Sequence, residues 1–554
     1  MHMIRNCQII SKYKWLLVAW FFINLIQAYF TNLHYDEAYY WLYSKILDWG
    51  YFDHPPLIAL ISKIGVSISH STLGLRIIPV LMGVIVLLGI LKLAEDKTNE
   101  MNLFLYIISF PLITSHIAGF LTLPDASLCF FFIFFLFFYK KYLQEDSLNN
   151  VLILSLVVAA MIYSKYHAFL IIAFTILANT KLLLKRSFWL ITFCSFCLLI
   201  PHFIWQFQND FPSLLYHLNT RTSGFSLSNF TDYIFSQLLL AGPLSGLIII
   251  FLAIKFNPKN IFERTLKYIA LGFYLFFLIY CFRSRIEAHW TSVATIPLII
   301  ISYKQLTHVI KIKKVMPYLI YPSVILILCA RFILAGDNFE DKLTLKSNFR
   351  NMEKWANEVD SISNGSPVLF TSKYQDLSVY SFAKNKWIPG APKFRTRYSQ
   401  IDLYKLDSIY EGKKVFALSY GNDIKWESKN RKKNYGSFIE DYYSYTGVEI
   451  DDISLRYEDT TLFLSFELFN NTKKQRLFVK DTRQKLKLYY NIDNVKYYYY
   501  LNELTKEKYI MPFERIKFNL PIKNINSDKV QLEMMLLSNN LRVYSVRRKK
   551  YKVE

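Results

Sequence analysis

Two adjacent carboxylates open the part of the sequence that is richest in reactive side chains. Asp36 and Glu37 follow directly on an apolar segment that ends near residue 31. Carboxylates beside a membrane surface carry a desolvation cost, which makes them candidates for a function. One could act as a general base that deprotonates an acceptor hydroxyl, while the other could orient the acceptor. A solvated loop is the alternative, and the residue types alone favour neither interpretation.

Aromatic side chains surround these carboxylates. Such residues suit a helix that lies in the membrane interface, and their ring faces also suit sugar rings. An aromatic belt without a catalytic role is the alternative. The residues concerned are Tyr39, Tyr40, Trp41, Trp49, Tyr51 and Phe52.

The elements that position these residues follow from the distribution of apolar residues. Hydrophobic residues make up 53% of the chain, and the long apolar runs lie within residues 15–335. This predicts a transmembrane domain over residues 1–335, a soluble α/β domain over 336–440 and a soluble β-rich, sandwich-like domain over 441–554. The expected fold class is therefore an α-helical polytopic membrane protein with a soluble C-terminal region.

About eleven segments are long and apolar enough to be membrane spans, each of which needs about 20 residues. No convincing signal-peptide cleavage site follows the first segment, so it is predicted to remain as an anchor. The predicted spans are residues 15–31, 75–93, 102–119, 125–139, 150–163, 167–184, 188–205, 234–254, 268–282, 290–303 and 318–335.

Lys and Arg set the expected orientation, because the cytoplasmic loops of membrane proteins are enriched in them. With the N-terminus in the cytoplasm, the loops on that side carry three times as many Lys and Arg residues as the opposite loops. The loop that holds Asp36 and the soluble region then both face a periplasm-like space. The net charge of +23 has this membrane explanation, so no nucleic-acid partner is predicted.

The soluble region shows signals of both helices and strands. An acceptor-handling module and a structural cap over the membrane site are equally compatible with it. Helices are expected at residues 354–361 and 376–383, and strands at 367–371, 415–418, 462–468 and 541–546.

Five short motifs together resemble those of a known enzyme class. Asp-Glu-Ala-Tyr-Tyr-Trp at 36–41, with Asp-Trp-Gly-Tyr-Phe-Asp-His-Pro-Pro-Leu at 48–57, is similar to the first periplasmic loop of bacterial GT-C glycosyltransferases. The kin are the protein O-mannosyltransferase-like family (glycosyltransferase family 39) and the lipid A aminoarabinose transferases. The other motifs follow in the family's order: Thr-Leu-Pro-Asp-Ala at 122–126, Ser-Lys-Tyr-His-Ala at 164–168, Pro-His-Phe-Ile-Trp-Gln-Phe-Gln-Asn-Asp at 201–210 and Arg-Ser-Arg-Ile-Glu-Ala-His-Trp at 283–290. The resemblance covers residues 15–310.

The resemblance implies a bacterial inner-membrane enzyme that takes a sugar from a polyprenyl-phosphate carrier and places it on a periplasmic acceptor. Asp36 is then the best candidate for the base or acceptor-orienting group, and Glu37 would support it. Asp125, at the start of a span, could reach the same cavity, although a simple helix cap is the alternative. The implied substrate-binding residues are Tyr39, Tyr40, Trp41, Asp53 and Tyr166.

On the same basis the leaving group is a lipid phosphate, which needs cations or donors because negative charge grows on it. In the aminoarabinose transferases the position of His54 is usually Lys. A histidine keeps the donor capacity but makes the charge depend on pH. Headgroup anchoring is the alternative for the two arginines. The candidates are Lys165, foremost, then His167, His54, Arg283, Arg285 and His289.

No residue spacing forms a recognised metal signature. No metal or other cofactor is therefore predicted as required, although Asp36, Glu37, Asp53, His54 and Asp125 could gather around a divalent ion. The expected partners are the polyprenyl-phosphate-linked sugar, a lipid or glycan acceptor and the bilayer, with the protein as a monomer.

Three functions stay open at this stage. The first is transfer of a sugar to lipid A or another envelope glycolipid or glycan, and the second is the same chemistry on a protein. The third, from another class, is a flippase or transporter of a lipid-linked sugar, for which internal repeats and interrupted helices are expected. The sequence shows no repeat between its halves and does not identify the sugar.

Overall fold

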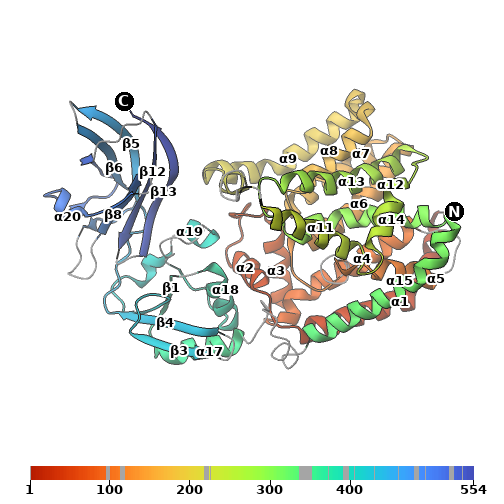
Figure 1. Cartoon of the computed structure of the whole chain (residues 1–554), viewed down its shortest axis with the longest axis horizontal. Coiled ribbons are helices and arrows are strands. Elements are labelled where there is room, and N and C mark those ends of the chain that lie inside the picture. Colours follow the sequence, from red (N-terminus) through yellow and green to blue (C-terminus); the bar gives the residue numbers. More distant parts are fainter. Residues whose placement is uncertain are drawn as a thin grey trace. The chain divides into compact units, whose positions relative to one another are not determined.

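The chain folds into two compact units, Met1–Arg350 and Asn351–Glu554. Figure 1 shows a first unit built of helices, whereas the described strands belong to the second unit. The computed structural model describes residues 2–94, 100–112, 119–217, 224, 226–335, 352–371, 373–390, 399–404, 406–428, 431–458, 461–478, 486–492, 495–522, 529–538 and 541–553.

Helices form the first unit because a long apolar run inside a bilayer can satisfy its backbone hydrogen bonds within one segment only as a helix. Short 3₁₀ turns, η2 (Thr180–Leu184) and η4 (Ala288–Thr291), interrupt them. The helices are α1 (His2–Phe30), α2 (Tyr35–Lys45), α3 (Leu57–Ile68), α4 (Thr72–Ala94), α5 (Glu100–Ile108), α6 (Pro124–Gln144), α7 (Leu148–Ser164), α8 (Ala168–Ala178), α9 (Arg186–Gln208), α10 (Pro212–Leu215), α11 (Leu227–Ala241), α12 (Gly246–Lys255), α13 (Ile261–Tyr280), α14 (Ser292–Leu306) and α15 (Ile310–Leu334).

Four described helices, α4, α6, α9 and α15, are each long and apolar enough to cross a membrane. Two bent pairs, α1 with α2 at 88° and α11 with α12 at 85°, raise the number to six if each pair is one span. The protein is therefore a multi-pass membrane protein. Each predicted span falls on a helix, but several of these helices are shorter than a full span, so the figure of eleven stays a prediction. Part of the span predicted at 102–119 lies outside the described residues.

The span predicted at 234–254 is two helices, and Gly242 explains the break between them. Its φ of +144° is a conformation that side chains with a Cβ rarely adopt. A Cβ there would also lie 2.3 Å from the hydroxyl oxygen of Ser245. Pro243 follows directly and cannot donate the backbone hydrogen bond that would continue the helix.

Helix α14 is the packing centre of the first unit. Its residues from Ser292 to Tyr303 are all buried, and it packs against α4, α6, α12 and α13. Helix α6 in turn packs on α7, and α7 packs on α9. The first turns of α6 and α14 lie together, because the hydroxyl of Ser292 donates to Asp125. These two helix starts define one end of the unit, here called the site end.

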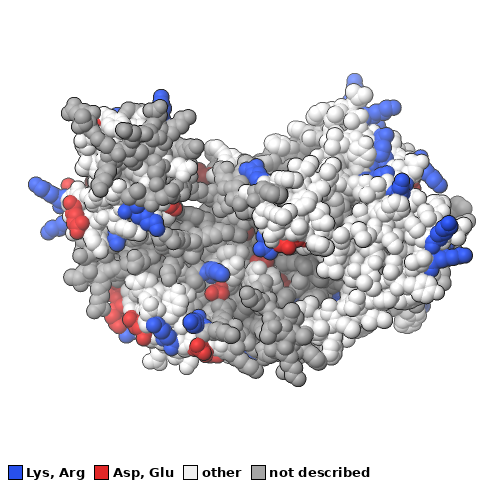
Figure 2. Space-filling model, viewed as in Figure 1, with Lys and Arg blue, Asp and Glu red and all other residues white. Residues whose placement is uncertain are grey.

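Basic residues gather at the opposite end, called the basic end. There Lys304 of α14 pairs with Glu263 at 2.8 Å, and Lys140 lies over the Phe262 ring near the start of α13. Figure 2 shows blue side chains along one edge of the first unit and a largely white face beside them. Three of the segments that the sequence assigns to the cytoplasm, 140–149, 255–267 and 304–317, thus meet at one end, although the side of the membrane stays a prediction.

The second unit begins with a mixed sheet in the order β1-β2-β4-β3, accompanied by helices. Strands β1 and β2 are parallel, and the other pairs are antiparallel. The helices and strands expected from the sequence in this part are all present. The elements are α17 (Met352–Ser363), β1 (Val368–Phe370), α18 (Tyr374–Ala383), α19 (Gln400–Tyr404), η5 (Asp407–Tyr410), β2 (Val415–Leu418), β3 (Ile424–Ser428) and β4 (Arg431–Ile439).

Two antiparallel sheets follow, in the orders β11-β6-β5 and β13-β12-β8-β9. Burial alternates strictly along β6, as expected of a strand with one face in a core, and residues of both sheets share one hydrophobic cluster. The predicted β-rich region is confirmed. Its elements are β5 (Val448–Glu458), β6 (Thr461–Asn470), β7 (Arg476–Leu477), β8 (Leu486–Ile492), β9 (Val495–Tyr500), α20 (Leu501–Leu504), β10 (Tyr509–Ile510), β11 (Arg515–Ile522), β12 (Lys529–Ser538) and β13 (Leu541–Lys552).

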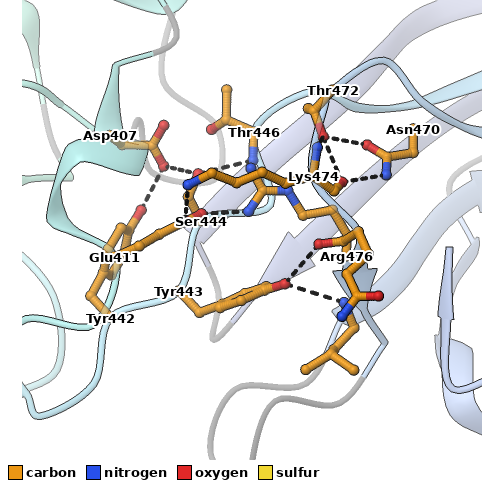
Figure 3. A network of polar contacts seen from close by, with 12 residues as sticks. Asp407, Glu411, Tyr442, Tyr443, Ser444, Thr446, Asn470, Thr472, Lys474 and Arg476 are labelled. Atoms are coloured by element: carbon orange, nitrogen blue, oxygen red, sulfur yellow. Dashed lines mark hydrogen bonds and ion pairs between the residues drawn. The ribbon is translucent and has the colours of Figure 1, made fainter. Parts of the chain in front are cut away.

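A polar network connects the mixed sheet to the β-rich part (Figure 3). Glu411 accepts hydrogen bonds from Arg476 and, at 3.0 Å, from Lys474. Asp407 accepts from the hydroxyls of Tyr442 and Ser444, each at 2.7 Å. Burial and the nearby Asp407 raise the pKa of Tyr442 well above its ordinary value, so this phenol remains a donor. These contacts join side chains of both parts, which suits a structural connection, although Arg476 Nε is buried without a hydrogen-bond partner among the described residues.

Candidate active site

A buried carboxylate and a buried ammonium form the centre of the site end. Lys165 Nζ lies 2.8 Å from Asp125 Oδ1, and Ser292 Oγ donates to the same oxygen at 2.7 Å. Asp125 is 2% exposed and Lys165 is 4% exposed. The sequence placed these two residues near one another, and the structure brings them into contact. A buried pair of this kind is stable only when its hydrogen bonds are well made.

Local sequence explains both positions. Pro124 occupies the first turn of α6, where its missing N–H costs nothing, and the next residue is the Asp125 carboxylate at the positive end of the helix dipole. Lys165 is the residue at which α7 ends, with an extended backbone, before α8 begins. An ammonium group has three N–H donors, and Asp125 takes one of them. Lys165 can therefore hold a second anion without leaving the first.

Histidines lie around this pair. The charges that act on Asp125 include His289, and those that act on His54 include Asp53, Lys165 and His217. His289 is in η4, one turn before Ser292. The His167 ring stacks on Phe277 with a centroid distance of 5.5 Å and meets Trp290 edge-on at 5.7 Å. Predicted site residues from four separate motifs thus converge on the Asp125–Lys165 pair, together with His217, which the sequence did not suggest.

His54 is a neutral hydrogen-bonding group rather than a cation. Burial lowers its pKa to about 4, with Asp53 acting against this and Lys165 acting with it. Its Nε2 lies 3.0 Å from the hydroxyl of Tyr40, and its Nδ1 is buried with no hydrogen-bond partner among the described residues. If Tyr40 donates to Nε2, then Nδ1 carries the proton and is a donor.

The predicted substrate-binding residues of the first loop are mostly packed inside it. Trp41 and Tyr39 are buried, and the Trp41 ring lies against His70. Asp53 accepts a hydrogen bond of 2.5 Å from Tyr43. Tyr40 bonds His54, and Asp53 acts on His54 through its charge, so these two residues connect to the charged cluster. The geometry gives Tyr39 and Trp41 a packing role, and it corrects the expectation that all these ring faces are open to a sugar.

Glu37 is saturated by other contacts. Its carboxylate binds Arg76 through both oxygens, at 2.9 and 2.6 Å, and accepts backbone hydrogen bonds from Thr122 at 2.9 Å and His34 at 3.1 Å. Arg76 also donates to three backbone carbonyls at the end of α1. A carboxylate whose oxygens accept four hydrogen bonds is a poor proton acceptor. Glu37 is therefore an anchor between helices, not a second base.

Asp36 is the more accessible of the two adjacent carboxylates. Its side chain is 29% exposed and lies 3.8 Å from His34. The neighbouring Glu37 bonds the backbone of Thr122, two residues before Pro124. The first turn of α2 and the first turn of α6 therefore lie at the same end, and Asp36 shares the site end with Asp125.

The late arginines lie differently from Lys165. Arg283 and Arg285 are exposed in the segment between α13 and η4. The following turn is fixed by Thr291, whose hydroxyl donates to Gln237 at 2.5 Å. The segment thus delivers His289 and Ser292 to the buried pair, while the arginines stay at the surface.

The end of α9 holds the first loop in place. His202 Nδ1 lies 2.6 Å from the carbonyl of Trp49, and Trp205 donates to Asp48 at 2.8 Å. Tyr166, a predicted substrate contact, accepts from Gln206 at 2.9 Å and lies 3.2 Å from His202 Nε2. The motif at 201–210 therefore positions the first loop and the residue next to Lys165.

Sequence reasoning missed Arg76, Ser292 and His217. Arg76 carried a usable signal, because a lone arginine inside an apolar span needs an acidic partner. Ser292 carried none, since a serine at a helix start is common. Among the described residues no group of three His, Cys, Asp or Glu side chains is arranged to hold a metal ion. The absence of a required metal stays a prediction.

Comparisons with known proteins concern the same part of the chain. Residues 53–205, which contain His54, Asp125 and Lys165, match the family model described as dolichyl-phosphate-mannose-protein mannosyltransferase. The fold is that of the GT-C glycosyltransferases, as the motifs led us to expect. It is similar to crystal structures of ArnT from Cupriavidus metallidurans, one in the apo state (TM-score 0.55, 11% identity) and one bound to undecaprenyl phosphate (TM-score 0.56, 12% identity). Each comparison covers 77% of this chain and 98% of that one. No curated protein matches the chain in sequence.

Proposed function

We propose that this protein is a membrane glycosyltransferase that moves a sugar from a polyprenyl-phosphate carrier to a periplasmic acceptor. The observation that carries the proposal is the buried Asp125–Lys165 pair, whose ammonium keeps donors for a second anion at the site end. The likeness to an ArnT structure that binds undecaprenyl phosphate supports a carrier of that kind. On this proposal the protein acts in the bacterial inner membrane as a monomer and needs no metal.

The reaction is a single in-line displacement at the anomeric carbon. An acceptor oxygen forms the new bond to that carbon while the bond to the phosphate oxygen breaks, and the carrier leaves as its phosphate. Lys165 stabilises the negative charge that grows on this phosphate, and a neutral His54 donates a hydrogen bond. Asp125 and Ser292 hold the ammonium in position and do not contact the sugar.

Asp36 orients the acceptor in this scheme. If the acceptor is a hydroxyl, the carboxylate takes its proton as the bond forms; if it is a phosphate already ionised at neutral pH, no base is required. Its exposed position suits contact with a large acceptor, whereas Glu37 has no free capacity.

The acceptor we propose is lipid A or another envelope glycolipid or glycan, by kinship with the aminoarabinose transferases. A protein acceptor is the second candidate, because the matching family model is described as a protein mannosyltransferase. Mass spectrometry of envelope lipids and of envelope proteins, with and without this chain, separates the two. A sugar increment that is lost from lipids alone supports the first, and one lost from proteins alone overturns it.

Asp36→Asn tests the mechanism. We expect transfer to a hydroxyl acceptor to fall by about 10²–10⁴-fold, with folding and carrier binding retained. Asp232→Asn is the matched control, since Asp232 is exposed on α11 and belongs to none of the five motifs. Normal transfer by Asp36→Asn to a hydroxyl acceptor would remove the base from the mechanism.

A further inference from the structure

A cavity lies far from the candidate active site. It has a volume of about 320 Å³ and is lined by residues of α5, the end of α14 and the first half of α15. Helix α14 begins at Ser292 beside Asp125 and ends at Leu306, so its two ends are about 20 Å apart at 1.5 Å per residue. The cavity is therefore at the basic end and is separate from the site that handles the sugar.

The interior of this cavity suits hydrocarbon. Leu105, Met316 and Ile320 contribute apolar side chains to its wall. The hydroxyl of Tyr106, another lining residue, is hydrogen-bonded to Ser302, so it does not need a hydrogen bond from an occupant of the cavity. The lining of this partly open hollow is mostly apolar, so it favours a hydrocarbon occupant over water.

The cavity lies on a helix that faces lipid. Helix α15 is long and apolar enough to span a membrane, and only 28% of its apolar window is buried. Ile325 and Tyr318 are exposed apolar residues on it, and Tyr321, which lines the cavity, is 47% exposed. A lipid chain could thus enter from the bilayer without crossing the protein core.

Positive charge stands at the same place. Lys313 lines the cavity, and Lys311 and Lys314 are exposed next to it at the start of α15. Among the residues whose side chains the structure describes, no carboxylate forms an ion pair with any of these three lysines, in contrast to Lys304, which pairs with Glu263. Thr307 and Asn102 add polar groups to the lining. Clustered lysines beside a membrane helix attract anionic lipid headgroups.

We propose that this cavity is a binding site for one anionic glycerophospholipid. One acyl chain lies between α5, α14 and α15, and the phosphate headgroup is held by Lys313 with help from its two lysine neighbours. A soluble anion would leave the apolar wall unused, and a zwitterionic lipid would leave the lysine charge uncompensated. The lipid joins α5 to α15 and so stabilises the end of the unit opposite the active site.

The test compares two lipids that differ only in headgroup. The purified full-length protein in detergent is titrated with dioleoyl phosphatidylglycerol or dioleoyl phosphatidylcholine, and bound lipid is counted by native mass spectrometry. We expect one phosphatidylglycerol to bind preferentially, and Lys313→Gln to weaken its binding by about fivefold, the equivalent of about 1 kcal/mol per lysine. Leu105→Phe, which fills the wall, should weaken binding of phosphatidylglycerol while leaving the lysines in place.

Lys255→Gln is the matched control, because Lys255 is an exposed lysine at the end of α12 with its ammonium over the Phe251 ring. Equal losses from Lys313→Gln and Lys255→Gln would mean a general surface-charge effect and would overturn the site. If Leu105→Phe left the binding of phosphatidylglycerol unchanged, the proposed position of the acyl chain would be wrong. The readout is lipid binding, so it is independent of whether sugar transfer is the activity.

Discussion

Two buried ion pairs lie at the site end of the membrane unit, and they are built differently. The Glu37 carboxylate accepts four hydrogen bonds, two of them from Arg76, and Arg76 also donates to three backbone carbonyls. Lys165 binds Asp125 but retains donor capacity. Burial and charge are alike in the two pairs, so neither property separates structure from chemistry. The number of hydrogen-bonding positions left over differs: the first pair is an anchor, and the second is the one to which our proposed function gives substrate contact.

The largest expected effect is on sugar transfer, and it comes from the Asp125–Lys165 pair, whose ammonium retains donor capacity. Lys165→Met should lower sugar transfer by about 10²–10³-fold, because the developing charge on the leaving phosphate loses its cation. Transfer assayed with a polyprenyl-phosphate-sugar donor checks this. Lys165→Arg should recover part of the activity, and Lys63→Met, which changes an exposed lysine of α3, should leave it unchanged. If a folded Lys165→Met protein transferred sugar at a rate within twofold of the parent, the proposed difference between the two pairs would be wrong.

A change in the Glu37–Arg76 pair should instead lower the stability of the protein. Arg76→Met leaves the Glu37 charge buried without compensation, and we expect the free energy of unfolding to fall by about 3–5 kcal/mol. Thermal unfolding in detergent measures this, and adding Glu37→Gln to the same protein should restore part of the loss. The molecules that remain folded should still transfer sugar. A stable but inactive Arg76→Met protein would give this pair a catalytic part.

His54 provides a pH test of the site end. Its folded pKa of about 4 lies below the ordinary value of 6.5, so the folded state prefers the neutral ring. The stability that follows is complete above pH 6.5 and is lost as pH falls towards 4, by about 2–3 kcal/mol. His54→Gln should flatten the unfolding free energy over this interval. An unchanged pH profile in that variant would assign the acid sensitivity to other groups.

The smallest effect is expected from a pair that is not buried. Lys185 and Asp146 lie 3.1 Å apart at the basic end with side chains 41% and 37% exposed. Lys185→Gln should change the free energy of unfolding by less than about 0.5 kcal/mol, because water screens such pairs. The same thermal unfolding measurement applies. A loss of unfolding free energy comparable to that of Arg76→Met would show that the exposure of an ion pair does not determine its contribution to stability.

The sequence predicted the parts of the site that lie where apolar runs end. Asp125 and Lys165 stand out as charged residues at the borders of apolar segments, and their motifs placed them together. The helices and strands of the second unit were also predictable, because alternation and apolar runs are local signals.

Other features depend on neighbours that no local pattern reveals. Tyr39 and Trp41 were expected to face substrate, but the bend between α1 and α2 turns them into the interior. Glu37 and Asp36 are adjacent and chemically alike, and only the distant Arg76 and Thr122 separate their roles. The break at Gly242 was visible in the Gly-Pro pair, but the apolar residues on both sides concealed it.

The four-way contact of Glu37 also bears on how the chain assembles in a membrane. Its partners come from the backbone at His34, the side chain of Arg76 in α4 and the backbone of Thr122 before α6. Until α4 and the segment before α6 have been inserted beside α2, this carboxylate lacks most of its ligands and carries an open charge penalty. In an incompletely inserted chain the charge of Glu37 in the first loop therefore stays uncompensated. This free-energy cost disappears only when the helices that carry the candidate site have come together.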